Sequence, residues 1–404
     1  MASYTDAAGA GTPAQGPAPG TVSTDLGTAI DDAPWSPFQK LLLGCFALVF
    51  AVDGLANQSL GIVLPALIED WGTPRASFAP VTAANLAGAA IPNGAALIAE
   101  FTPEKRRGRA IAIGMVFIPI GGIIAGGLGA TLLELFGWRT LFFVAGSLPI
   151  LVALAFVTFL PESPSFLLRA SRHEELARLL KRCRISYDPA HRFDAPPPAT
   201  TMTAPLRLLL SPALRHQTLL LWGGFFTCLM ASYTIFSWVP TMLSTLGFDL
   251  TMTSLGITTF HMGGVVGALI SGIILDRVGF SRTHMALAGG TAVLAAILAI
   301  MLGSDVVSAL IILPVMMALG FCIAGLHNTL YTLAATSYPT DARATGVGVA
   351  SATGRLGAVL SSFTGVISLD LGGSFAFFAV VAVLLALCGL AGYAARAKRK
   401  AALA

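Results

Sequence analysis

Long apolar runs, separated by short polar segments, fill most of the chain between residues 38 and 395. Each run has about 20 residues or more, and a helix of roughly that length crosses the hydrocarbon core of a bilayer. Backbone polar groups inside a bilayer must be hydrogen-bonded within their own segment, so the runs predict helices rather than open strands. The ten predicted spans are 38–67, 76–99, 109–133, 139–160, 216–245, 252–275, 284–303, 307–336, 343–369 and 373–395.

The composition agrees with an integral membrane protein, because 55% of the 404 residues are hydrophobic and only 11% are charged. The five cysteines stand singly, without the pairing of a disulfide framework or the spacing of a metal site, and are expected to be small packing residues. The sequence contains no arrangement of nucleophile and base. We therefore expect no enzyme activity, no cofactor and no metal.

The positive charges indicate how the chain is oriented. If both termini are cytoplasmic, 21 of the 24 Lys and Arg residues fall in cytoplasmic segments, Arg75 and Arg139 lie outside, and Arg355 lies within a span. The positive-inside rule favours this topology over its inverse, in the inner (plasma) membrane of a cell. The pI near 8.9 therefore reflects the placement of loops, and no nucleic-acid partner is expected.

An internal repeat divides the chain into two halves. Pro65 and Gly72 align with Pro240 and Gly247 at an offset of 175 residues, whereas Phe101–Arg109 aligns with Tyr338–Gly346 at an offset of 237. The offset grows by 237 − 175 = 62 residues, about the length of two membrane crossings with their loops. We therefore expect the first half to lack two crossings near residues 85–92. The span 76–99 would then join the outer part of one helix to the inner part of another.

These features divide the chain into five parts. Residues 1–37 are rich in Gly, Ala, Pro and Thr, lack Lys and Arg, and are predicted to be a disordered cytoplasmic tail rather than a signal peptide. The remaining parts are a shortened N-terminal bundle (38–160), a cytoplasmic linker (161–215), a C-terminal six-helix bundle (216–395) and a basic cytoplasmic tail (396–404).

Several motifs resemble a known family. GALISGIILDRVGFSR (Gly267 to Arg282) is similar to the signature loop of the major facilitator superfamily, and PESPSFL and YPTDARATGVGVASATGRLGA resemble features of its metabolite–proton symporters. DGLANQSLGIVLPAL, with AAIPNGAALIAEFTPEKRRGRA, resembles the aromatic acid:proton symporter family. The resemblance implies an all-α membrane protein with a two-bundle fold, here with about ten transmembrane helices (4 + 6) instead of twelve. Two departures are Ala56, where that family usually has a second acid, and the absence of the first-half signature loop.

Two ionisable residues lie deep in predicted spans, where a charge is costly unless it faces a wet cavity or a partner. Asp53 could carry the coupling proton, or it could be a structural carboxylate bonded to a neighbouring helix. Arg355 offers a fork of donors that matches a carboxylate, as an aromatic acid requires, or it could pin helices through an ion pair.

Other residues in or near the spans are candidates for substrate or proton binding. His261 and His327 could titrate or could be neutral packing residues, and the second, beside Asn328, is the better candidate. Asn57, Gln58, Asn85, Asn93 and Asn328 could bind a ring hydroxyl or could bridge helices. Tyr233, Phe236 and Trp238 could stack on an aromatic substrate, although Trp238 could equally be a packing residue.

A third group lies at the cytoplasmic ends of the spans and could form an inner gate, or could serve topology alone. Because the first-half signature loop is missing, Glu100 and Arg106 are expected to have lost their partners. The gating candidates are Glu100, Arg106, Gly267, Asp276, Arg277, Arg282, Asp341 and Arg343.

Together these features predict a secondary transporter that couples the uptake of a small aromatic carboxylate, of the benzoate or hydroxybenzoate type, to protons by alternating access. Its partners would be a small organic anion, a proton and the lipid bilayer, and we expect a monomer. Three alternatives remain open: a transport-inactive truncated carrier, a membrane sensor, and a symporter of another small organic acid.

Overall fold

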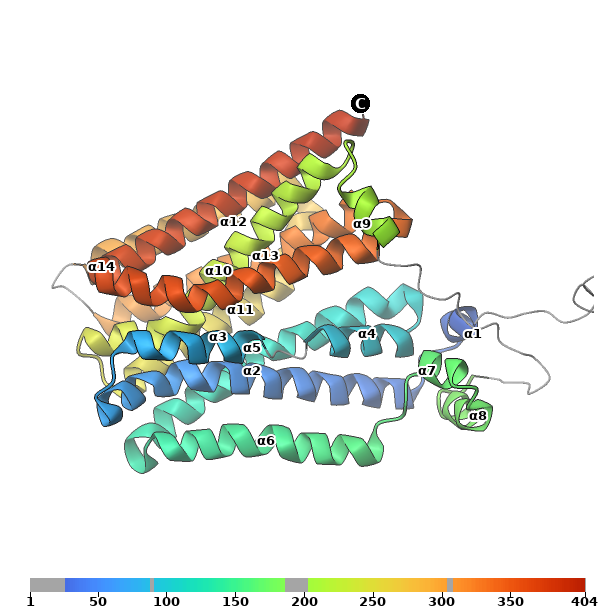
Figure 1. The fold of residues 1–404 in the computed structure, drawn as a ribbon, viewed down its shortest axis with the longest axis horizontal. Helices are drawn as coiled ribbons and strands as arrows, with labels where there is room; N and C mark the ends of the chain where they lie inside the picture. The colour runs from blue at the N-terminus through green and yellow to red at the C-terminus, as the bar shows by residue number, and fades with distance from the viewer. Residues whose placement is uncertain (1–25, 88–90, 186–202, 304–307, 404) are drawn as a thin grey trace, which may run out of the picture.

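The computed structural model describes residues 26–87, 91–185, 203–303 and 308–403, and the part of the chain that it describes is helical, without strands. Figure 1 shows the helices as a long bundle whose members run back and forth along one axis. The first half contains α2 (Pro37–Trp71), η1 (Arg75–Phe78), α3 (Ala79–Ala87), α4 (Ile91–Phe101), α5 (Glu104–Phe136) and α6 (Trp138–Phe159). The second half contains α10 (Arg215–Thr245), α11 (Leu250–Val278), α12 (Phe280–Leu302), α13 (Ala309–Ser337) and α14 (Thr340–Leu403).

Among the described residues, eight helices are long and apolar enough to cross a membrane. Seven of them, α2, α5, α6 and α10 to α13, match one predicted span each. The eighth, α14, contains two predicted spans, because the backbone reverses at Gly372 and Gly373. Gly373 has a φ of 60° and a ψ of −148°, a conformation that favours glycine. Figure 1 shows the two arms of α14 lying beside each other on either side of this reversal.

The predicted span 76–99 contains the end of η1, α3 and α4, and its residues 88–90 lie outside the described residues. The structure describes α3 and α4 as separate short helices on either side of residues 88–90. They pack on different halves, since α3 lies against α14 whereas α4 lies against α2 and α5. That this segment joins parts of two different helices stays a prediction from the repeat.

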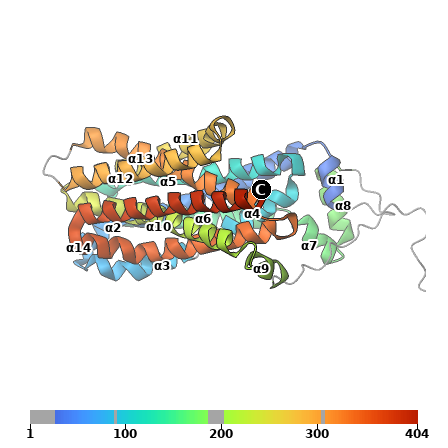
Figure 2. The same ribbon diagram turned by 90° about the horizontal axis from the view of Figure 1, so that it is seen from above.

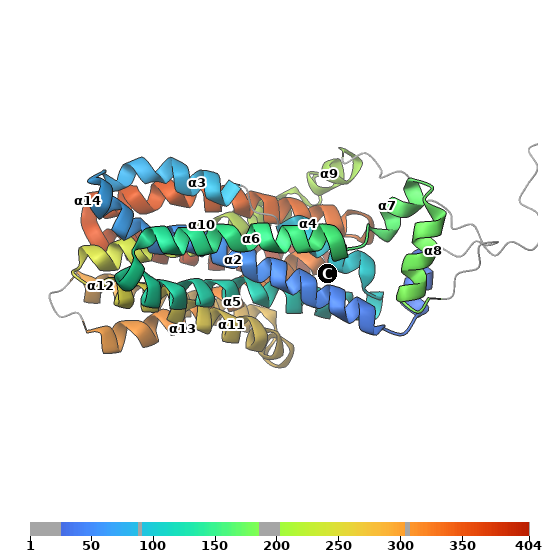
Figure 3. The same ribbon diagram turned by 90° about the horizontal axis from the view of Figure 1, so that it is seen from below.

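The bundle has two distinct ends, visible in all three ribbon views (Figures 1, 2 and 3). The α8 end carries α1 (Leu26–Asp32), α7 (Pro164–Arg169), α8 (His173–Arg182) and α9 (Thr203–Leu209). The Gly137 end carries the turn between α5 and α6 and the reversal in α14. In Figure 1, α10 and the second arm of α14 slope away from α2 toward the α8 end.

Close helix crossings depend on small residues. A Cβ atom on Gly121 of α5 would lie 1.9 Å from the carbonyl oxygen of Ala51 on α2, so no larger residue fits there. The same reasoning applies to Gly267 of α11, where a Cβ atom would lie 2.2 Å from the carbonyl oxygen of Phe321 on α13. Contacts of this kind are typical of membrane helices, which gain little from hydrophobic contact in lipid and associate through close packing.

Part of the predicted disordered tail is ordered, and that expectation is wrong for Leu26–Asp32, which form α1; residues 1–25 lie outside the described residues. The backbone N–H of Glu104, at the start of α5, donates to the Asp31 carboxylate at 2.7 Å. Leu26 and Ile30 of α1 pack in a hydrophobic cluster with side chains of α2, α4, α7 and α8. Tertiary contacts therefore hold a helix that is too short to be stable alone.

Candidate substrate-binding site between the two halves

Asp53 and Arg355 come from opposite halves and lie near one side chain. Asp53 on α2 and Arg355 on α14 are both half-buried. Both act electrostatically on the hydroxyl of Tyr233, a half-buried residue of α10. The structure therefore brings three residues that the sequence singled out to the boundary between the halves. No ion pair within the described part of the chain includes Arg355.

A group of aromatic residues in the second half lies beside Arg355. Tyr331 of α13 is affected electrostatically by Arg355, and its hydroxyl lies 3.1 Å from the Ser351 hydroxyl, one turn before Arg355 on α14. The Tyr331 ring is 4.9 Å from the rings of both His327 and Phe225. The Nε2 atom of His327 is buried and has no hydrogen-bond partner among the described residues.

Sequence reasoning missed Tyr331 and Ser351. A signal was present, because Tyr331 follows His327 by four residues and Ser351 precedes Arg355 by four, and residues at that spacing share one face of a helix.

The side chain of Asn328 faces α11 and not the aromatic group around Tyr331. Its amide nitrogen donates to the carbonyl oxygen of Ala268 at 2.9 Å and to the Ser271 hydroxyl at 3.0 Å, both on α11. Successive residues of a helix point about 100° apart, which explains why Asn328 and His327 face different neighbours. Of the two roles considered for Asn328, the structure shows the bridge between helices.

The polar residues of α2 form contacts with three other helices. Asn57 donates to the carbonyl oxygen of Asp53 at 2.9 Å, and its own side-chain oxygen lies 3.4 Å from the Asn85 amide on α3. Gln58 donates to the carbonyl oxygen of Phe236 on α10 at 2.9 Å, and His261 on α11 lies at the other side of its amide. Asn93 is in α4, but its side chain lies outside the described residues.

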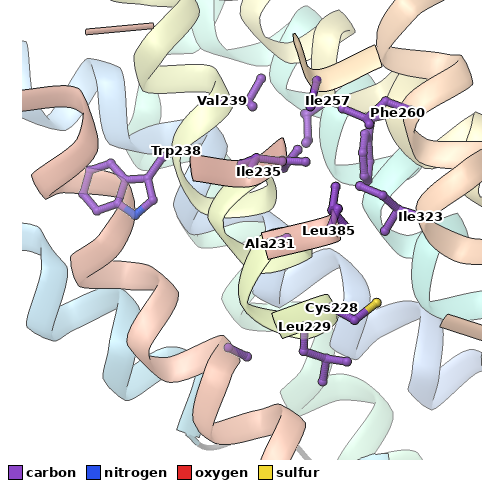
Figure 4. Packing of buried hydrophobic residues seen from close by; sticks show 14 of the residues in the cluster. Cys228, Leu229, Ala231, Ile235, Trp238, Val239, Ile257, Phe260, Ile323 and Leu385 are labelled. Carbon is purple, nitrogen blue, oxygen red and sulfur yellow. The ribbon is translucent and has the colours of Figure 1, made fainter. Parts of the chain in front are cut away.

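Trp238 is a packing residue in this structure. Its side chain is fully buried, and a Cβ atom on Gly365 of α14 would lie 2.2 Å from the indole ring. Figure 4 shows the indole pointing away from Ile257, Phe260 and Ile323. No surface is left on which a substrate ring could stack, so we correct the expectation that Trp238 contacts the substrate.

Glu100 and Arg106 have partners, contrary to the sequence-based expectation. The Ser163 hydroxyl, in the segment that leads to α7, donates to the Glu100 carboxylate. The Arg106 guanidinium lies 5.5 Å from the centre of the Trp35 ring, a favourable cation–π geometry. Residues near the start of α2 and after α6 therefore supply the contacts that the missing loop cannot.

The other gating candidates do not form a visible network. Asp276, Arg277, Arg282 and Arg343 are exposed, and no ion pair within the described ranges includes them. The side chain of Asp341 lies outside the described residues, and Gly267 serves the close crossing of α11 and α13 described above.

The polar contacts that join the halves lie from the middle of the bundle to the Gly137 end. The Thr251 hydroxyl of α11 donates to the Glu134 carboxylate of α5 at 2.8 Å. Arg75 of η1 and Asp370 of α14 form an ion pair at 2.9 Å. Neither contact could be predicted from the sequence, because nothing in the local pattern shows which residues of one half contact the other.

The side chains that commonly bind metals are scattered through the structure. In the part of the chain that it describes, no group of three or more His, Cys, Asp or Glu side chains is placed to hold a metal ion. The five cysteines are free thiols, and three of them are buried.

The chain is similar to known transporters along most of its length. The family model of the Major Facilitator Superfamily matches residues 41–362. The 4-hydroxybenzoate transporter PcaK of Pseudomonas aeruginosa is 28% identical over 88% of this chain and 92% of the relative. The gallate transporter of Pseudomonas putida is 29% identical over 86% of this chain and 90% of the relative. The 3-(3-hydroxy-phenyl)propionate transporter of Escherichia coli is 30% identical over 80% of this chain and 68% of the relative.

The alignment with PcaK also contains a deficit in this chain. It has 417 positions, whereas 88% of 404 residues is about 356, so roughly 417 − 356 = 61 positions of the relative have no counterpart here. This number is close to the 62 residues that the internal repeat predicted.

Solved structures show the same fold. The crystal structure of a D-xylose-proton symporter is similar with a TM-score of 0.57 at 14% identity, covering 88% of this chain and 97% of that one. A partially occluded, inward-open structure of the xylose transporter XylE from E. coli gives 0.55 at 15% identity, covering 90% of this chain and 88% of that one. The chain is therefore a multi-pass membrane transporter, not an enzyme, and it belongs to the Major Facilitator Superfamily, beside members named as aromatic acid transporters.

Proposed function

We propose that the protein couples the uptake of a small aromatic carboxylate, of the benzoate or hydroxybenzoate type, to the entry of protons. The observation that carries this proposal is that Asp53 and Arg355, one from each half, both lie near enough to Tyr233 for their charges to act on its hydroxyl. The names of the relatives support the substrate class, since they include carriers of 4-hydroxybenzoate and gallate.

Each group in the site has a chemical role in the proposal. The Arg355 guanidinium binds the carboxylate of the substrate with two parallel hydrogen bonds. In this proposal the rings of Tyr233 and Tyr331 stack on the substrate ring, and the Nε2 atom of His327, which has no hydrogen-bond partner among the described residues, is available to the substrate. Asp53 takes up the proton from one side and releases it to the other, and Asn57 lies one turn away to contact a ring hydroxyl.

Alternating access follows from the placement of these residues. Because Asp53 belongs to one half and Arg355 to the other, a rocking motion between the halves changes the surroundings of both groups at once. We assign the α8 end to the cytoplasm of the cell and the protein to its inner membrane, since the Lys and Arg residues of the loops gather at that end. The chain acts as a monomer in this proposal.

The test is uptake of labelled 4-hydroxybenzoate into proteoliposomes with an imposed proton gradient. We expect accumulation that a protonophore abolishes. Arg355→Gln should lower uptake by at least tenfold, which corresponds to about 1.4 kcal/mol of lost binding. Asp53→Asn should abolish proton-driven accumulation while exchange of labelled for unlabelled substrate continues, and Arg139→Gln, an exposed control at the Gly137 end, should leave uptake unchanged.

The deficit of about 61 positions favours a second candidate, a carrier that binds its substrate without moving it. The same vesicles separate the two. Binding of 4-hydroxybenzoate that Arg355→Gln removes, without any flux, would replace the transport proposal. Uptake that ignores both the protonophore and Asp53→Asn would remove proton coupling from it.

A further inference from the structure

Gln58 makes the one side-chain amide contact, among the described hydrogen bonds, that joins α2 to two helices of the second half. Its nitrogen donates to the carbonyl oxygen of Phe236 on α10 at 2.9 Å. Its oxygen lies 2.9 Å from Nε2 of His261 on α11, which fixes that nitrogen as the donor. Gln58 and His261 are both buried, with 3% and 5% of their surfaces exposed.

Packing around His261 leaves its ring little freedom. A Cβ atom on Gly122 of α5 would lie 2.5 Å from the Nε2 atom of His261, so the ring sits directly against the α5 backbone. On its other sides, the ring lies 4.9 Å from that of Phe236 and 5.9 Å from that of Phe260. The His261 side chain thus belongs to the second half but packs against α5 of the first half, at Gly122.

The position of this contact relates it to the candidate site. Gln58 follows Asp53 by five residues on α2, and Phe236 follows Tyr233 by three residues on α10. Holding Gln58 against Phe236 therefore fixes the register between the helix that carries Asp53 and the helix that carries Tyr233.

We propose that Gln58 and His261 form a bridge that sets the register of the two halves and stabilises the arrangement seen here, in which the halves meet at the Gly137 end. His261 is a positioning residue in this proposal, because it acts through Gln58. Separating the halves at the Gly137 end pulls α2 away from α10 and α11, so the bridge must break in the alternative arrangement. The inference rests on the two-half transporter fold and is independent of the substrate proposed above.

The test measures how often the Gly137 end opens, using the full chain in detergent. Ser254, near the start of α11, is fully buried and faces Gly129 of α5 across the boundary. It is replaced by cysteine in a chain whose own five cysteines are changed to alanine, and the rate of maleimide labelling is followed. Because both ends are accessible in detergent, the result depends on neither the orientation nor the substrate.

Loss of the bridge should speed this labelling. We expect His261→Leu and Gln58→Leu each to raise the rate by about three- to tenfold, the effect of losing one buried hydrogen bond. The double variant should label no faster than Gln58→Leu alone, since both changes remove one shared contact. His261→Gln should restore the slow rate because its amide can reach the place of Nε2, whereas the shorter His261→Asn should not.

His284 supplies a matched control. It is a buried histidine of α12 that contacts the Thr329 hydroxyl at 2.7 Å and the Gly389 carbonyl oxygen at 3.2 Å, both within the second half. His284→Leu should lower the melting temperature without speeding the labelling of Cys at position 254.

The outcomes decide the proposal even if one variant fails to fold, because Gln58→Leu and His261→Gln test the same contact separately. The proposal is overturned if folded Gln58→Leu and His261→Leu chains label at the original rate, if their effects add in the double variant, or if His284→Leu speeds labelling equally.

Discussion

At the level of single residues, the use of a side chain depends on which helix it faces rather than on its type. Asn57 and Asn328 are both amides within helices of the bundle. Asn57 lies one turn from Asp53, near the candidate site. The amide nitrogen of Asn328, in contrast, donates hydrogen bonds to α11. The surroundings of each amide therefore decide which one can meet a substrate.

Cys183, just after α8, is buried outside the membrane-spanning helices, and it yields a prediction at this scale. Burial raises the pKa of its thiol to about 11. Only about 0.1% of the thiol is then ionised at pH 8, and the thiolate is the form that reacts with maleimides. We expect Cys183 in the folded chain to label at least a hundredfold more slowly than in the denatured chain.

The rate for Cys183 should then rise roughly tenfold for each pH unit between 8 and 10, as the thiol begins to ionise. Mass spectrometry of the Cys183 peptide after timed exposure to N-ethylmaleimide measures this rate. Equal labelling of folded and denatured protein at pH 8 would show that the thiol is not buried in the hydrophobic cluster that includes side chains of α1, α7 and α8.

Asp53 and Arg355 could be selected from the sequence as candidates, because an ionisable residue in an apolar run is conspicuous and costly. The sequence could not identify the pairing of Gln58 with His261, or that of Tyr331 with Ser351. Neutral polar residues occur in many membrane helices, and their partners depend on how helices from distant parts of the chain are rotated against one another.

At the level of helices, glycine at crossing points decides how closely two helices approach, and α5 contains a matched pair for testing this. Gly121 lies against the backbone of α2, whereas a Cβ atom on Gly127 would have no neighbouring atom within 4 Å. We expect Gly121→Ala to lower stability by about 1–3 kcal/mol through overpacking. Gly127→Ala should be neutral or stabilising by up to about 1 kcal/mol, because alanine favours the helix.

Thermal unfolding of the two purified variants, followed by circular dichroism in the same detergent, measures the difference. A melting temperature for Gly121→Ala equal to that for Gly127→Ala would mean that α2 and α5 do not cross as closely as described.

The positions of the long helices could be predicted because hydrophobic length alone determines a membrane span. Two other features could not be predicted. α1 has only seven residues and depends on Asp31 and on contacts with distant helices, so its local sequence carries little signal. The second is that α3 and α4, which belong to one apolar run in the sequence, pack against different helices, and hydropathy does not show this.

At the level of the whole molecule, a covalent crosslink between the two halves at the Gly137 end should block transport. Glu134 of α5 and Thr251 of α11 are in hydrogen-bond contact across the two halves. We expect a short bifunctional crosslinker between Glu134→Cys and Thr251→Cys to stop uptake of 4-hydroxybenzoate, because the halves can no longer separate there. A cleavable crosslinker should restore uptake when it is cut.

Asp70 and Arg139 provide the control, since they form an ion pair at 3.3 Å between α2 and α6, within the first half. Crosslinking cysteines at these two positions should leave uptake unaffected. Full uptake with the Glu134–Thr251 crosslink in place would argue against any motion between the halves at this end.

The division into two halves could be predicted from the internal repeat, because a repeat shows as a constant sequence offset. The change in that offset also predicted a number of missing residues close to the number of unmatched positions in the alignment with PcaK. The contacts between the halves could not be predicted. Pairs such as Arg75 with Asp370 depend on how one bundle is placed against the other, which no periodicity within a single helix encodes.

The separate docking of α3 and α4 sets a limit on the amplitude of any rocking. α3 rests on α14 and is joined through η1 and α2 to the first half, while α4 rests on α2 and α5. Only four peptide steps connect Ala87 to Ile91, and a fully extended chain of that length reaches about 14 Å. As long as α3 stays packed on α14, this short connection limits how far the two halves can move apart. A larger movement requires α3 to dissociate from α14 first.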